Sequence, residues 1–234
     1  MACLCKQIAG NNIELSSTCI GSLWIFQNLA PGDIQAIVRN ALRKKRTKGQ
    51  ALFFQGDSAD EVFLIKGGRI KLTKVLEDGT ELLLDIRKNG DFVGENMFSE
   101  KGLYPVSAVC LEDTLTCGFS RTQFEELVIQ YPTVGLQVIK NLSERISWLT
   151  DRVGCLAVSN IEERLYRVLH NVAKEHGEQS PKGMVIQFPL THEDLSFLTG
   201  AHRVTITRAI KTLKQAGKIV LEGRRLILPA LKIV

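Results

Sequence analysis

The chain has 234 residues, a mass of 26.0 kDa and a formal net charge of +5. Its composition, 44% hydrophobic and 24% charged, is ordinary for globular proteins and excludes disordered, collagenous and purely coiled-coil classes. No apolar run is long enough to cross a bilayer, and the first residues lack the apolar stretch of a secretory signal. We therefore expect a cytoplasmic protein with no membrane partner, and the length suits two domains.

The first half of the chain reads mainly as antiparallel strands. A short amphipathic helix is predicted over residues 29–42, and apolar runs broken by turn dipeptides such as Asp78-Gly79 follow it up to about residue 120. The clearest strands are expected at 63–65, 69–73 and 81–86, and a short helix is expected at 121–128. This spacing predicts an antiparallel β-roll, jelly-roll-like in outline, closed by a helix.

A heptad pattern dominates the middle of the chain. Apolar residues recur at intervals of three and four, with Ile or Val alternating with Leu, an arrangement that favours a parallel two-stranded coiled coil. The alternative is that these residues pack onto the β-roll of their own chain. The predicted dimer contacts are Ile139, Leu142, Ile146, Leu149, Val153 and Leu156.

A helix-turn-helix is predicted from Thr191 onward. Thr191 followed by Asp194 is a variant of the helix N-cap signature, and Gly200 stands where a tight turn between two helices needs a residue without Cβ. The second helix has one apolar face and one basic face, and a hairpin over 219–228 follows it as a wing. A short strand is expected at 184–190, after a loop at 176–183.

Positive charge is concentrated in this last segment. From Ala201 to the C-terminus there are eight Lys or Arg residues and one acid, Glu222, and phosphate is the natural counterion. Arg203 and Arg208 can each present a two-pronged donor to guanine in the major groove. The residues assigned to a double-stranded DNA interface are Thr191, His202, Arg203, Val204, Thr205, Thr207, Arg208, Lys211, Arg224 and Arg225.

The order of these motifs resembles the CRP/FNR family of transcription regulators. The resemblance rests on Gly67-Gly68-Arg69-Ile70-Lys71-Leu72, Asp78-Gly79-Thr80-Glu81 and Gly90-Asp91-Phe92-Val93-Gly94-Glu95, followed by the heptad helix and the winged helix-turn-helix. It implies a homodimeric regulator, an activator or a repressor, that binds a near-palindromic promoter site and recruits or blocks RNA polymerase. The expected fold is α+β, with a leader at 1–28, a sensor roll at 29–132, a dimerisation helix at 133–158 and a DNA-binding domain at 159–234.

The resemblance also indicates where an effector would bind. Relatives that bind cyclic nucleotides use the Glu after Gly94 on the ribose and an Arg-Ser pair on the phosphate, and here Tyr104-Pro105 replaces that pair. Because a buried phosphodiester without its arginine loses a strong partner, a cyclic nucleotide is disfavoured relative to another small organic effector or haem. Val204 makes the recognition segment resemble the halophenol-responsive branch. The predicted effector contacts are Gly94, Glu95, Tyr104, Pro105, Val106, Trp148 and Thr150.

An iron-sulfur cluster is a second possibility for the effector. Cys117 falls where the FNR branch places its fourth cluster ligand, and Cys3, Cys5 and Cys19 lie in the leader. The alternative is that the later cysteines are small buried hydrophobic residues and that the leader thiols undergo reversible oxidation.

We do not expect an enzyme. A metal-dependent enzyme on a β-roll needs histidines inside the roll, and all four histidines follow the heptad segment. The alternative function is a cyclic-nucleotide-binding-type regulatory module that acts through protein contacts rather than DNA. Such a module would not need the basic recognition helix.

Overall fold

A computed structural model describes residues 24–26, 29–30, 32–34, 37, 41–186, 188, 190–223 and 225–229. The chain divides into two compact units, Met1–Ser143 and Glu144–Val234, which are described separately. The helix predicted at 29–42 is described only in part, because residues 31, 35, 36 and 38–40 lie outside the described residues, and it stays a prediction.

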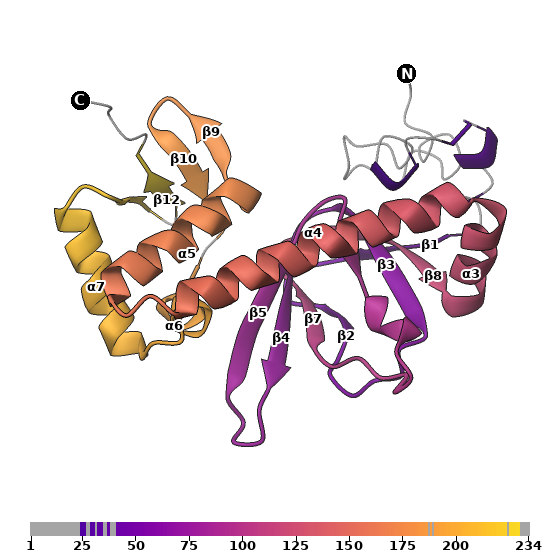
Figure 1. The fold of residues 1–234 in the computed structure, drawn as a ribbon, viewed down its shortest axis with the longest axis horizontal. Helices are drawn as coiled ribbons and strands as arrows, with labels where there is room; N and C mark the ends of the chain where they lie inside the picture. The colour runs from indigo at the N-terminus through magenta and orange to yellow at the C-terminus, as the bar shows by residue number, and fades with distance from the viewer. Residues whose placement is uncertain are drawn as a thin grey trace. The chain divides into compact units, whose positions relative to one another are not determined.

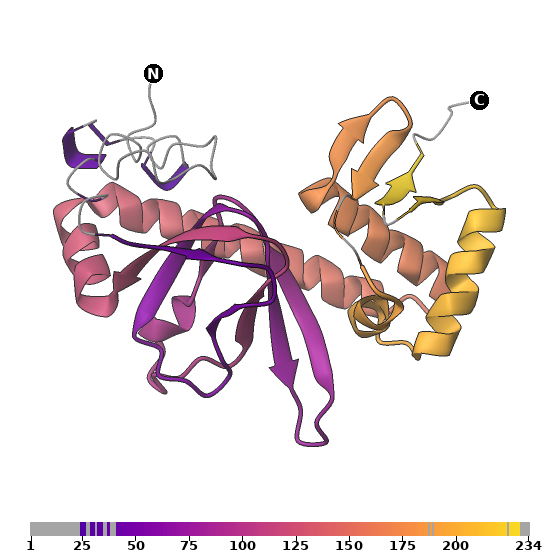
Figure 2. The same cartoon turned by 180° about the vertical axis from the view of Figure 1, so that it is seen from behind.

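The first unit contains two four-stranded antiparallel sheets (Figure 1). One has the order β1-β8-β3-β6 and is built from Leu42–Arg46, Thr114–Ser120, Glu61–Gly67 and Phe92–Val93. The other has the order β2-β7-β4-β5 and is built from Ala51–Phe53, Ser107–Cys110, Ile70–Val75 and Glu81–Arg87. The β4–β5 hairpin extends beyond the rest of its sheet in both views (Figures 1 and 2). The predicted antiparallel β-roll is thus confirmed.

The core of the first unit is apolar and receives side chains from both sheets. Leu64 on β3, Ile70 on β4 and Val93 on β6 have no solvent exposure, and Phe53 on β2 is also buried. Burial of a large aliphatic or aromatic side chain contributes about 1.5 to 3 kcal/mol relative to exposure, so this core supplies much of the stability of the roll.

The first unit also contains helical segments outside its sheets. A short 3-10 helix precedes the strands (η3, Trp24–Phe26), and another follows β6 (η4, Glu95–Phe98). Helix α3 (Arg121–Gln130) begins at a capping box formed by Ser120 and Gln123, and it confirms the helix predicted at 121–128. Helix α4 (Pro132–Leu156) then runs from the first unit into the second.

The second unit combines three helices with a four-stranded sheet (Figure 2). Its helices are α5, α6 and α7, spanning Ile161–His176, His192–Thr199 and Arg203–Gln215. The sheet has the order β11-β12-β10-β9, with strands Val220–Glu222, Arg225–Leu228, Gly183–Ile186 and Glu178–Ser180. Helix α5 begins at Asn160, whose side chain accepts a hydrogen bond from the backbone N–H of Glu163.

Two sequence predictions in the second unit need correction. The segment 176–183 is not simply a loop, because Glu178–Ser180 forms β9 and pairs with β10. The strand expected at 184–190 ends earlier, since β10 spans Gly183–Ile186. The sequence did not predict β9, because Glu-Gln-Ser has no apolar alternation. This strand is formed by its backbone pairing with β10.

None of the helices in the described part of the chain is long and apolar enough to cross a membrane.

Candidate nucleic-acid interface and effector region

Helices α6 and α7 form the predicted helix-turn-helix. At the start of α6, the Asp194 backbone N–H donates to Thr191 Oγ1 at 3.0 Å, and the Thr191 backbone N–H donates to Asp194 Oδ2 at 2.8 Å. Gly200 ends the helix in the left-handed conformation, with φ of 63°. Helix α7 then begins at His202, whose Nδ1 accepts a hydrogen bond from the Val204 backbone N–H at 3.4 Å. The predicted cap and turn are both confirmed.

Helix α7 has the two faces that the sequence predicts. Its buried face packs on α5 and α6 through Ile206, Ala209, Ile210 and Leu213. The opposite face is exposed and carries Arg203, Val204, Thr205, Thr207, Arg208 and Lys211. Arg203, Arg208 and Lys211 form no ion pair or side-chain hydrogen bond with any other described residue. These three cations are therefore available to an external anion.

One residue at this surface was absent from the predicted interface. His192, at the start of α6, places its Nδ1 2.9 Å from Thr207 Oγ1 on α7. The Thr207 hydroxyl also lies 3.0 Å from the Arg203 carbonyl oxygen, as a donor to it. The His192 contact fixes the side chain of a predicted interface residue across the turn. The sequence offered only a weak signal, a histidine directly after the N-cap.

The wing is a hairpin of β11 and β12 in which Glu222 pairs with Arg225 across the turn. Lys182 from the β9–β10 turn makes an ion pair with Glu222, with 2.6 Å between Nζ and Oε1. Arg225 is exposed, whereas Arg224 lies outside the described residues. The DNA contacts assigned to both residues stay predictions.

Helix α4 presents the predicted heptad residues to solvent within the single chain. We call Ile139, Leu142, Ile146, Leu149, Val153 and Leu156 the apolar stripe. Their exposed fractions run from 36% at Leu142 to 67% at Val153. Ile139 and Leu142 lie in the same unit as the β-roll, and the structure leaves both exposed rather than packed onto it.

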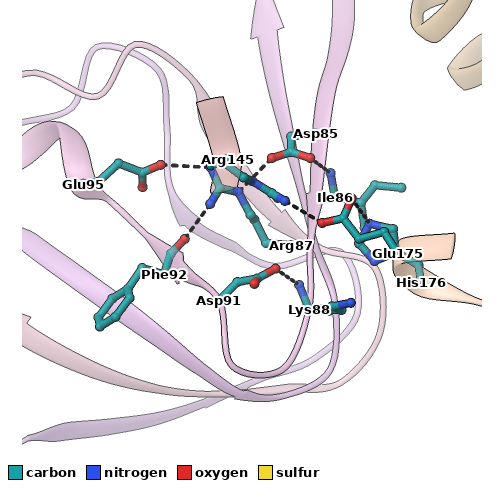
Figure 3. A network of polar contacts seen from close by, with 10 residues as sticks. All are labelled: Asp85, Ile86, Arg87, Lys88, Asp91, Phe92, Glu95, Arg145, Glu175 and His176. Carbon is teal, nitrogen blue, oxygen red and sulfur yellow. Dashed lines mark hydrogen bonds and ion pairs between the residues drawn. The ribbon is translucent and has the colours of Figure 1, made fainter. Parts of the chain in front are cut away.

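The second half of α4 is tied to α5 within the second unit. Arg145 Nη1 lies 2.6 Å from Glu175 Oε1 in a largely buried ion pair, which is also drawn in Figure 3. The guanidinium groups of Arg145 and Arg152 each lie 4.9 Å from the centroid of the Trp148 ring. The exposed Thr150 hydroxyl donates to the Ile146 carbonyl oxygen at 2.9 Å. The assignment of Trp148 and Thr150 to an effector site stays a prediction.

In the β-roll, Glu95 belongs to a charged cluster that the sequence did not reveal (Figure 3). Arg87, only 6% exposed, places its Nε 2.8 Å from Asp85 Oδ2 and its Nη2 2.9 Å from Glu95 Oε1. Its Nη1 donates to the Phe92 carbonyl oxygen at 3.2 Å. A buried guanidinium thus holds the Glu95 carboxylate in place.

Gly94, directly before Glu95, cannot accept a side chain. Its φ is 95°, and a Cβ atom would lie 2.6 Å from the Glu61 carbonyl oxygen. A residue with a side chain would therefore be strained and would also push β3 away from η4. Gly94 fixes the turn that brings Glu95 to Arg87.

The other predicted effector residues lie along the segment before β7. Tyr104 is buried, stacks on Phe53 with 3.7 Å between ring centroids, and its hydroxyl donates to the Glu61 carbonyl oxygen at 2.5 Å. Burial raises the pKa of Tyr104, so the hydroxyl stays a protonated donor well into the alkaline range. The structure gives Tyr104 a packing function. Pro105 is exposed and Val106 is half-buried against the core.

The structure does not bring the predicted cysteine ligands together in a metal centre within the described residues. Cys3, Cys5 and Cys19 lie outside the described residues, and Cys117 is fully buried in β8. Within the described ranges, no group of three His, Cys, Asp or Glu side chains could hold a metal ion. Among the described residues, Cys110, Cys117 and Cys155 are buried and form no disulfide, and burial raises the pKa of the Cys110 thiol. The iron-sulfur cluster stays a prediction.

The fold and these surfaces define a class of protein: a β-roll joined through a long helix to a winged helix-turn-helix with an unneutralised basic face. Residues 43–131 match the family described as "Cyclic nucleotide-binding domain", and residues 163–232 match "Crp-like helix-turn-helix domain".

Known proteins match almost the whole chain. The "CRP-like cAMP-activated global transcriptional regulator" of Mycobacterium tuberculosis is 24% identical and the match covers 87% of this chain and 91% of that protein. The "Anaerobic regulatory protein" of Bacillus subtilis is 28% identical over 83% of each chain. In fold, the chain resembles a CooA mutant from Carboxydothermus hydrogenoformans, with a TM-score of 0.72, 22% identity and coverage of 93% and 94%. The chain belongs to the CRP/FNR family of transcription regulators and is a DNA-binding regulator, not an enzyme.

Proposed function

We propose that the protein acts as a homodimer in the cytoplasm. The apolar stripe of α4 pairs with the same stripe of a second copy. Such a stripe is otherwise costly, because about 25 cal/mol is lost for each Å² of apolar surface left in water. A parallel coiled coil buries Ile or Val at one core position and Leu at the other, which is the order found here.

Two recognition helices related by the dimer axis would read a near-palindromic promoter site. In helix-turn-helix dimers, half-sites lie about 34 Å apart, one turn of duplex, so that each second helix enters a major groove on the same side of the DNA. The observation that carries this proposal is the exposed face of α7, where Arg203, Arg208 and Lys211 have no partner among the described residues. A DNA-bound dimer of this kind would regulate transcription through contact with RNA polymerase.

The effector is proposed to act through the β-roll. The Glu95 carboxylate, which would face the ribose of a cyclic nucleotide according to the family resemblance, is engaged by Arg87 instead. We therefore favour a small organic effector other than a cyclic nucleotide. The effector would shift the population between two arrangements of α4 and would thereby change the separation of the recognition helices.

An iron-sulfur cluster is the competing effector, and iron content separates the two. If the effector is a small organic molecule, the protein purified without oxygen should contain no stoichiometric iron. One cluster per chain, lost after substitution of Cys117 by Ser, would replace that proposal with a cluster.

The DNA proposal is tested by selection from fragmented genomic DNA. The wild-type chain should enrich fragments that share a motif with two inverted halves, and Arg203→Ala/Arg208→Ala should enrich none. Affinity for a selected fragment should fall steeply with salt, because each phosphate contact adds about −0.9 to the slope of log affinity against log salt. Failure to enrich any fragment, under both reducing and oxidising conditions, would favour a module that acts through protein contacts.

A further inference from the structure

The second unit contains a cavity that the DNA-binding function does not use. It has a volume of about 300 Å³ and lies between α5 and the sheet that carries the wing. Helix α5 contributes Tyr166, His170 and Lys174, and the opposite wall includes Met184 of β10, Leu228 of β12 and Pro229. All of these residues lie in one compact unit, so the cavity does not depend on how the two units are placed.

The rim of this cavity is cationic. His170 and Lys174 are one turn apart on α5, so they lie on the same side of the helix. Both are exposed, and neither side chain forms a hydrogen bond or an ion pair with another described residue. The described residues that line the cavity include no acid. Nearby, Lys218 places its Nζ 5.3 Å from the centroid of the Tyr166 ring. The cavity therefore favours an anionic group at its mouth.

The inner wall has a different character. Leu228 is buried, Met184 and Pro229 are partly buried, and these side chains offer no charged group. A small inorganic anion would leave this apolar wall uncovered, whereas a flat apolar body would cover it. The thioether of Met184 also makes favourable contacts with aromatic rings.

We infer that this cavity binds a planar aromatic anion, such as an arene carboxylate, with its ring against Met184 and Leu228 and its charged group at Lys174 and His170. The volume is at the lower end of the roughly 300 to 1,000 Å³ typical of ligand pockets, which suits one or two fused rings. This site lies in the DNA-binding unit and is separate from the effector region around Glu95.

Methionine methyl NMR tests this inference directly. The chain has three methionines, of which Met184 lines the cavity and Met97 is fully buried in the β-roll. With ¹³C-methyl-methionine labelling, 2-naphthoate should shift the Met184 methyl signal through its ring current and leave the Met97 signal in place. A ligand of this size predicts a dissociation constant on the order of 1 mM. No Met184 shift at saturating probe, or equal shifts of both methyl signals, would overturn the proposal.

The cationic rim is tested by changing the charge of the protein and of the probe. Lys174→Gln should weaken 2-naphthoate binding by about threefold or more, as expected for loss of one exposed charge contact. Lys140→Gln, which removes the same charge from an exposed residue of α4, is the matched control and should leave binding unchanged. The neutral probe 2-naphthalenemethanol should bind more weakly than 2-naphthoate and ignore both substitutions. Equal binding of the two probes would reject an anion site. Because no DNA is present, failure here is distinct from failure of the proposed regulatory function.

Discussion

Among the charged residues of the β-roll, Arg87 should make the largest single contribution to stability. Substitution Arg87→Gln keeps hydrogen-bonding capacity but removes the positive charge between Asp85 and Glu95. Removing one partner of a buried ion pair typically lowers the free energy of unfolding by about 3 to 5 kcal/mol, because the remaining charge stays desolvated. Urea denaturation followed by fluorescence or circular dichroism measures this loss.

The control for Arg87 is a more exposed ion pair on the same sheet. Lys71 lies 3.0 Å from Glu81, and their side chains are 28% and 51% exposed. Lys71→Gln should therefore cost less than about 1 kcal/mol. Equal effects of the two substitutions would show that burial of the Arg87 cluster has no energetic consequence.

Substitutions at two glycines distinguish the cost of steric crowding from the cost of backbone strain. Gly94 and Gly79 have φ of 95° and 83°, but only at Gly94 would a Cβ atom meet backbone atoms. Gly79→Ala should cost about 1 to 2 kcal/mol, from the left-handed conformation alone. Gly94→Ala should cost clearly more in the same denaturation experiment. A smaller loss at Gly94 would contradict the close approach of Glu61.

The basic face of α7 predicts a specific loss of DNA affinity. On a selected duplex, Arg208→Ala should cost about 1 to 3 kcal/mol if the guanidinium makes a bidentate contact with guanine. Arg167→Ala is the control, because Arg167 is exposed on α5 and pairs with Glu163. Fluorescence anisotropy of a labelled duplex measures both. An unchanged affinity for Arg208→Ala would remove Arg208 from the interface.

The sequence predicted some features of these sites and could not predict others. The basic and apolar faces of α7 were predictable because both follow helical periodicity. The Arg87–Glu95 contact was not, because it joins β5 to η4 across a turn and leaves no periodic pattern. The same applies to His192 and Thr207, which are fifteen positions apart and meet only once the helices pack.

At the element scale, α4 carries the prediction for assembly. Leu149→Lys places a charge in the apolar stripe, where it would have to be desolvated in a dimer. Sedimentation equilibrium should therefore report a monomer for this variant and a dimer for the wild type. Asp151→Lys changes an exposed residue of α4 outside the stripe and should leave the dimer intact. A Leu149→Lys protein that remains dimeric would place the interface elsewhere.

Elements with strong local patterns were predicted well, and elements held by long-range pairing were not. The heptad repeat, the N-cap of α6 and its glycine C-cap each follow from residues close in sequence. Strand β1 was missed because its sequence, Leu-Arg-Lys-Lys-Arg, has no apolar alternation and depends on pairing with β8, some seventy residues later. Lys and Arg on an edge strand also protect it from unwanted pairing.

In the molecule as a whole, helix α4 joins two independently built units. The roll provides the charged cluster around Arg87, and the second unit provides the recognition helix and the ion pair between Arg145 and Glu175. Helix α4 contributes residues to both units, so pairing of its apolar stripe between two copies would link them.

The mass of the protein–DNA complex tests this account most directly. Native mass spectrometry or light scattering on a selected duplex should find two chains per duplex, bound together, with no complex of one chain at intermediate concentrations. Leu149→Lys should lose this complex at the same concentrations. A stable complex of one chain per duplex with wild-type affinity would contradict the proposal that the DNA-binding form is a dimer paired along α4.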